Sequence, residues 1–155
     1  MVFVPIGLGS GISACACARA LLGPSTRIVG VVSAHATAYL DSVRAGRIVT
    51  APVTTRLADG MACRVPDEGA LALIRREVDD VIAVSDDEVA AAMRALFADT
   101  HNVAEGAGAA SLAGALQQRA RWAGRSIGIT LTGGNVDSAL FARVLAGVDA
   151  PVQTA

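Results

Sequence analysis

The stretch Val4-Pro5-Ile6-Gly7-Leu8-Gly9-Ser10-Gly11-Ile12 decides the fold. Its apolar start predicts a buried strand over residues 2–6, and its glycines predict a tight turn into a helix. Glycines let backbone N–H groups converge in such a turn, and the start of a helix adds a dipole that favours an anion. We therefore expect this loop to bind a phosphate; a tight turn without any ligand is the alternative.

Outward from this stretch, short β-rich runs alternate with helical runs. The runs predict strands at 2–6, 27–33, 80–84 and 126–131, and helices at 12–22, 37–45, 67–78, 86–100, 109–122 and 137–146. Residues 103–108 are expected to form a turn, and residues 47–50 a short extended piece. Alternating strands and helices predict an α/β fold with a mostly parallel sheet flanked by helices.

Two local patterns refine this picture. Ser85-Asp86-Asp87-Glu88 predicts a capping box, in which the Ser hydroxyl and the Glu carboxylate satisfy free N–H groups at a helix start. Leu71, Ile74 and Val78 share one helical stripe and predict packing rather than a site. No internal domain boundary is visible, so residues 1–147 are expected to form one unit and residues 148–155 a tail.

Composition excludes several classes of protein. The chain has 155 residues, a net charge of -1, 53% hydrophobic residues and 17% charged residues, which argues against disorder and against nucleic acid as the main partner. The apolar runs are too short to span a membrane. Three cysteines, an odd number, and an N-terminus without a basic leader favour the cytoplasm.

All 13 basic residues are arginine, and the chain contains no lysine. A P-loop needs a lysine, so that kind of phosphate loop is excluded. A dinucleotide-binding loop needs a third glycine where this chain has Ile12, and an acidic residue at the end of the second strand, where it has Ser33. Ser33 leaves an NADP-like site open as an alternative.

Four segments, in order along the chain, resemble the PLP-dependent threonine and serine dehydratases, a fold type II family that includes serine racemase. Residues 4–12 are similar to its glycine-rich phosphate loop, residues 57–62 to its Ala-Asp-Gly segment, residues 104–108 to its Glu-x-x-Gly turn, and residues 131–135 to its Ser/Thr-Gly-Gly-Asn strand end. The resemblance covers about residues 2–147 and implies the large-domain half of such an enzyme.

The resemblance implies pyridoxal 5'-phosphate (PLP) as the cofactor. It implies that the cofactor phosphate is held by the backbone N–H groups of one loop, which are those of Gly7, Gly9, Ser10 and Gly11. Some members of this family bind a divalent cation through carboxylates that follow the second strand. The matching residues 32–38 of this chain include no carboxylate, so no metal is expected there.

Roles around the cofactor ring are implied in the same way. The Thr132 hydroxyl would bond the pyridine nitrogen, Glu105 would lie near the ring, Gly60 would let the backbone approach the cofactor, and Gly133 would shape the pocket floor. Glu105 can equally be a carboxylate favoured by a helix start, and Thr132 an ordinary strand-end hydroxyl. Asn135 is expected to cap the following turn.

The resemblance covers only the C-terminal part of the family's catalytic region. The Schiff-base lysine and the loop that grips the substrate carboxylate belong to the other half, so no catalytic residue is expected in this chain. The implied activity is that of a threonine/serine ammonia-lyase, which eliminates the β-hydroxyl of a small hydroxy-amino acid to give a 2-oxo acid and ammonia. The chain would be a truncated form that needs a complementing N-terminal half or forms a homo-oligomer.

Two other interpretations stay open. The chain can be a non-catalytic module or relic that binds a phosphate compound, which the absence of lysine favours. It can also be a fragment of an NADP-dependent oxidoreductase, for which the glycine-rich loop is the only support.

Overall fold

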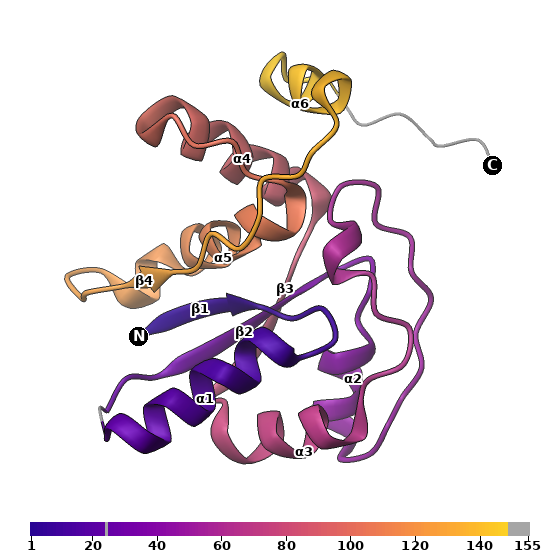
Figure 1. Ribbon diagram of the computed structural model, residues 1–155, viewed down its shortest axis with the longest axis vertical. Coiled ribbons are helices and arrows are strands. Elements are labelled where there is room, and N and C mark those ends of the chain that lie inside the picture. The colour runs from indigo at the N-terminus through magenta and orange to yellow at the C-terminus, as the bar shows by residue number, and fades with distance from the viewer. Residues whose placement is uncertain (24, 149–155) are drawn as a thin grey trace.

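A computed structural model describes residues 1–23 and 25–148, which form three layers (Figure 1). Pro24 and residues 149–155 of the expected tail lie outside the described residues. The middle layer is a four-stranded parallel sheet in the order β3-β2-β1-β4. Its strands are β1 (Val2–Pro5), β2 (Ile28–Ser33), β3 (Asp80–Val84) and β4 (Gly128–Ile129). The predicted α/β fold is confirmed.

Helices cover both faces of the sheet (Figure 1). One face carries α1 (Ser10–Leu22), α2 (Ala38–Ala45) and α3 (Glu68–Glu77). On the other face α5 (Gly106–Gln117) lies against the strands, α4 (Asp86–Thr100) packs on α5, and α6 (Ser138–Leu145) packs on α4. Two 3-10 turns complete the described elements, η1 (Asp59–Met61) and η2 (Arg119–Trp122). Within the described residues no helix is long and apolar enough to cross a membrane.

Each face of the sheet has its own core. Phe3 and Val31 point toward α5, whose small residues allow a close approach: a Cβ on Gly114 would lie 2.9 Å from Val31 Cγ2. On the opposite face Val4 and Val32 pack among the helices α1 to α3. Leu71 and Ile74 are buried in that second core and Val78 packs against it, which confirms their expected packing role.

The capping box of α4 is confirmed. The Glu88 N–H donates to Ser85 Oγ at 3.2 Å, and the Ser85 N–H donates to Glu88 Oε2 at 2.7 Å. The helix after Asn135 is capped by another residue: Asp137 Oδ1 accepts the Ala139 and Leu140 N–H groups at the start of α6. An aspartate next to the first helical residue reaches these donors directly.

Several predicted boundaries differ from the structure. The helix expected to run to residue 122 ends at Gln117, and residues 119–122 form the 3-10 turn η2. Residues 106–108 belong to α5 rather than to a turn. Glycine occupies positions 106 and 108 of this helix because any side chain there would collide with neighbouring backbone. The last predicted strand, 126–131, pairs only over Gly128–Ile129, where the short β1 offers partners. Residues 47–50, expected as a short extended piece, pair with no strand of the described sheet.

Candidate functional site

Strand β1 has a neighbour on each side, β2 and β4. The chain leaves β1 through α1 on one face of the sheet and reaches β4 after α4 and α5 on the other face. Where the direction of winding reverses in this way, the loops after the two strands diverge and open a crevice at their carboxyl ends. The glycine-rich loop follows β1 and Thr132 follows β4, so both predicted site segments lie at this crevice.

A groove with a volume of about 360 Å³ lies there. All the predicted cofactor-binding residues except Gly133 line it: Gly7, Gly9, Ser10, Gly11, Gly60, Glu105 and Thr132. Four segments that are far apart in the sequence therefore meet at one place. The groove is within the size range of pockets that bind small molecules.

The glycine-rich loop ends at the start of α1. Gly9 is the N-cap residue with a left-handed φ of 95°, and within the described chain no side chain caps the helix and no acidic residue lies in its first turn. The first N–H groups of a helix have no partner inside the helix. A Cβ on Gly11 would meet no atom within 4 Å, so open space lies beside these donors. Free donors, a helix dipole and open space together suit a phosphate.

The segment 57–62 forms the floor next to this loop. A Cβ on Gly7 would overlap the Gly60 carbonyl, so the two backbones are in direct contact. A Cβ on Gly60 would lie 2.9 Å from the Ala107 Cβ, so Gly60 also lets α5 approach. Asp59 Oδ1 accepts the Gly60 N–H at 2.9 Å, which agrees with a structural role in holding the loop.

Glu105 lies between this floor and the end of β4. Its N–H donates to the Gly133 carbonyl at 3.1 Å, and its Oε1 would lie 2.5 Å from a Cβ on Gly133 and 3.9 Å from one on Gly60. Glu105 is also the N-cap residue of α5, without a side-chain capping bond. Glu105 therefore lies at the start of a helix and also lines the groove, so its position agrees with both expectations.

Gly133 lies behind Thr132, with its backbone against Gly108 and the Glu105 carboxylate. Gly133 does not line the groove, while the exposed Thr132 does. The sequence reasoning missed four lining residues, Pro5, Leu8, Met61 and Ala107. Their signal was present, because each lies within two residues of one that was named.

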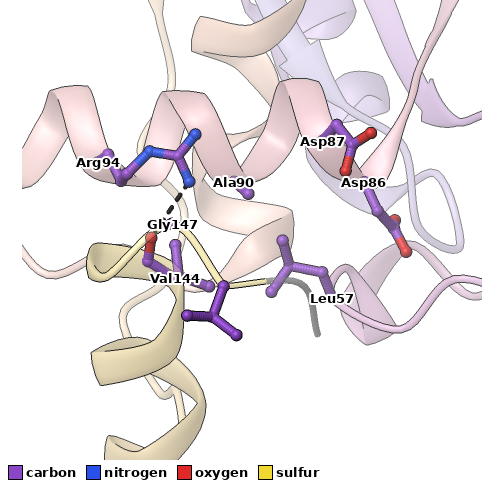
Figure 2. A pocket seen from close by; sticks show the side chains of 8 residues that line it. Leu57, Asp86, Asp87, Ala90, Arg94, Val144 and Gly147 are labelled. Atoms are coloured by element: carbon purple, nitrogen blue, oxygen red, sulfur yellow. Dashed lines mark hydrogen bonds between the residues drawn. The ribbon is translucent and has the colours of Figure 1, made fainter. Parts of the chain in front are cut away.

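A second hollow, of about 170 Å³, lies between α4 and α6 and contains none of the predicted cofactor-binding residues (Figure 2). The Asp86 carboxylate, on its rim, accepts hydrogen bonds from the Thr55 hydroxyl at 2.7 Å and the Arg56 N–H at 2.8 Å. Arg94 donates to the Val144 carbonyl at 3.1 Å, the dashed line in Figure 2. These polar groups already serve contacts within the fold, so we assign this hollow no chemistry.

The residues of the groove fit PLP. Backbone donors at the loop would suit its phosphate, the Thr132 hydroxyl would suit its ring nitrogen, and Met61 and Ala107 would add apolar surface to the site. None of the described lining residues is basic, so backbone N–H groups and the helix dipole would meet the phosphate charge.

Comparisons with known proteins agree with this geometry. The chain is 40% identical to the L-threonine ammonia-lyase of Geobacter sulfurreducens over 136 residues, which are 88% of this chain and 34% of that enzyme. Its fold matches the processed form of threonine deaminase isoform 2 from Solanum lycopersicum (TM-score 0.87, 28% identity, 94% of this chain and 41% of that one). It also matches maize serine racemase (TM-score 0.83, 32% identity, 94% and 46%).

The chain thus spans less than half of the length of these relatives. The sequence profile of one family, described as "Pyridoxal-phosphate dependent enzyme", matches residues 1–133, which is most of the chain. Together with the groove at the crevice between β1 and β4, this match shows that the chain belongs to the pyridoxal-phosphate dependent enzymes.

Proposed function

We propose that this chain is the phosphate- and ring-binding part of a PLP-dependent ammonia-lyase that acts on threonine, serine or a related small β-hydroxy-amino acid. The observation that carries the proposal is the groove, which joins an uncapped helix start to the Thr132 hydroxyl. Bound PLP withdraws electrons from the α-carbon of an amino acid, which allows the β-hydroxyl to leave and ammonia to be released with a 2-oxo acid.

The chain's own residues would bind and orient. Backbone N–H groups of Gly7, Gly9, Ser10 and Gly11 would hold the phosphate, and the dipole of α1 would add to their attraction. The Thr132 hydroxyl positions the ring through its nitrogen. A neutral hydroxyl does not force a proton onto that nitrogen, as a carboxylate would, and this favours elimination over reactions that need a long-lived carbanion. Glu105 orients groups at the ring edge.

Proton transfer at the substrate must come from elsewhere. The chain has no lysine, and the reaction needs an amine to hold the cofactor covalently and to move the α-proton. We propose that a segment equivalent to the rest of the relatives' length supplies this amine and completes the site. We also propose that the chain forms a homo-oligomer, although a second copy would bring no lysine. We also propose that the protein works in the cytoplasm, which its three free cysteines support.

A second candidate function is non-catalytic binding of a phosphate compound, and the absence of lysine is what favours it. The two functions share the groove and differ in whether a complementing segment restores turnover. One set of measurements therefore separates them.

The first measurement is binding. The purified chain is titrated with PLP, with pyridoxal, which lacks the phosphate, and with NADPH. We expect reversible binding of PLP and weaker binding of pyridoxal. We expect no cofactor left on the protein after borohydride reduction beyond non-specific labelling, because the N-terminus is the chain's only amine. Equal binding of PLP and pyridoxal would contradict the phosphate site, and tighter binding of NADPH would favour a nucleotide site.

The second measurement is turnover. The chain is mixed with the part of the Geobacter sulfurreducens relative that lies outside the matched residues, and ammonia release from threonine is followed. We expect turnover from the mixture and none from the chain alone beyond that of free PLP. PLP binding without any turnover in the mixture would leave non-catalytic binding as the function. Turnover by the chain alone would show that another residue supplies the amine.

A further inference from the structure

The chain has one tyrosine, Tyr39, and it lies beside the phosphate loop. Tyr39 is in the first turn of α2 and only 1% of its surface is exposed. Its hydroxyl donates to the Leu8 carbonyl at 2.7 Å and accepts the Asp67 N–H at 3.2 Å. One hydroxyl thus joins α2, the loop after β1 and the N-cap residue of α3.

The same contacts hold the loop in an unusual backbone conformation. A Cβ on Gly9 would lie 2.9 Å from the Tyr39 hydroxyl and 2.7 Å from the Ala70 Cβ. Ala70 is itself fixed, because its N–H donates to Asp67 Oδ1 at 2.8 Å. Tyr39 and the start of α3 therefore form a wall against which the loop is packed with Gly9 at a φ of 95°.

The hydrogen bond to Leu8 also sets the direction of a neighbouring donor. The Leu8 carbonyl and the Gly9 N–H belong to one planar trans peptide unit, so they point in opposite directions. A carbonyl held toward α2 turns the Gly9 N–H away from α2, and Gly9 lines the cofactor groove. Burial raises the pKa of the Tyr39 phenol, so the hydroxyl stays protonated and remains a donor at physiological pH.

We infer that Tyr39 is a positioning residue for the phosphate of the cofactor: its hydroxyl orients the Leu8–Gly9 peptide so that the Gly9 N–H is presented to an anion in the groove. The inference rests on the proposed function, because it assigns the loop a phosphate. Tyr39 itself touches no reacting atom.

The test removes the hydroxyl and compares ligands with and without a phosphate. Tyr39→Phe keeps the ring and deletes both hydrogen bonds. Ser42→Ala is the matched control, because Ser42 lies on the same helix, is fully buried, and bonds the Val49 N–H at 2.8 Å and the Val49 carbonyl at 3.2 Å, with neither bond to the loop. Dissociation constants for PLP, pyridoxal and inorganic phosphate are measured for each chain.

We expect Tyr39→Phe to weaken PLP and inorganic phosphate binding roughly tenfold, the order expected for one lost hydrogen bond that organises a site, with pyridoxal unchanged. Ser42→Ala should lower the melting temperature but keep the preference for PLP over pyridoxal. An unchanged preference in Tyr39→Phe, or an equal loss in Ser42→Ala, overturns the inference and leaves the proposed function intact. A wild-type chain without the preference overturns both.

A second measurement needs no variant. A chain that carries 3-fluorotyrosine has a single fluorine signal, because Tyr39 is the only tyrosine. We expect this signal to shift on addition of inorganic phosphate or PLP and to stay in place with pyridoxal. A signal that none of the three ligands moves would show that the loop binds its anion without Tyr39, whether or not the phenylalanine variant folds.

Discussion

Thr132 follows β4 with its side chain at the mouth of the groove. Thr132→Val keeps the shape of the side chain and removes the hydroxyl, while Thr132→Ser keeps the hydroxyl. A hydrogen bond of this kind contributes about 1 kcal/mol, so we expect Thr132→Val to bind PLP roughly fivefold more weakly with an altered absorption band. Equilibrium titrations check this, and equal affinities for the Val and Ser variants would mean that Thr132 is not the ring partner.

Two glycines of the phosphate loop differ sharply in what a methyl group would meet. Gly9→Ala places a Cβ at a positive φ and against Tyr39 and Ala70, so we expect a loss of about 2 kcal/mol or more in the free energy of unfolding. Gly11→Ala places a Cβ in open space inside a helix, and should be neutral or stabilising by about 0.5 kcal/mol. Urea unfolding of both variants measures the contrast, and similar losses would contradict it.

At the scale of elements, a cluster of charges joins α1 to the end of α3. Arg76 and Arg19 donate to the Glu77 carboxylate at 2.8 and 3.1 Å, and these bonds lower the pKa of Glu77 below its ordinary value of 4.5. A carboxyl group whose pKa is lowered by folding stabilises the fold above its ordinary pKa, and this contribution is lost as the pH falls through the lower folded value.

We therefore expect the stability of the wild-type chain to fall with acidification below about pH 4.5, and Glu77→Gln to make that decline shallower. Thermal melts between pH 3 and 7 measure the slope. The exposed Asp99→Asn is the control, since no salt bridge of the described chain involves Asp99. An equal effect of the two substitutions would show that the contacts of Glu77 with Arg19 and Arg76 do not contribute to the pH dependence of stability.

The elements that the sequence predicted well are those with local causes. β3 was predicted at its observed bounds because its apolar residues run directly up to Ser85. Ser85 begins a capping box that four consecutive residues are enough to identify. The start of α5 was missed because Gly106 and Gly108 have poor helix propensity; they are tolerated since they press on Leu57 and Gly133, contacts that no local pattern reveals. The role of Tyr39 was missed for the same reason, because Asp67 lies 28 residues away.

For the whole molecule, the open edge of the sheet governs behaviour in solution. Among the described strands β4 lies at the edge of the sheet, and Ile129 in it and Ile127 and Leu131 on either side of it are 38% to 40% exposed. The Gly128 N–H donates to the Met1 carbonyl just before β1, and the Thr130 N–H donates to the Phe3 carbonyl in β1, so alternation turns the peptide groups of the three apolar residues outward. An unpaired apolar edge invites another strand. We expect the isolated chain to self-associate, as seen by sedimentation at increasing concentration.

Ile129→Glu should shift the chain toward monomer, because a charge on an edge strand opposes pairing. Leu21→Glu adds the same charge at an apolar side chain that is 86% exposed on α1, away from the edge, and should have little effect. A wild-type chain that sediments as a stable monomer with a sharp cooperative melt would contradict the expectation.

The groove draws its lining from residue 5 to residue 132, almost the whole described chain. The groove exists only when both ends of the chain are folded together. The binding free energy of a ligand in the groove therefore adds to the free energy of unfolding. At a free concentration one hundred times its dissociation constant, a ligand stabilises the folded state by about 2.7 kcal/mol, a large share of what holds a domain of this size together. The concentration of free cofactor would therefore set the fraction of unfolded chain that proteases can cleave, and with it the amount of this protein in the cell.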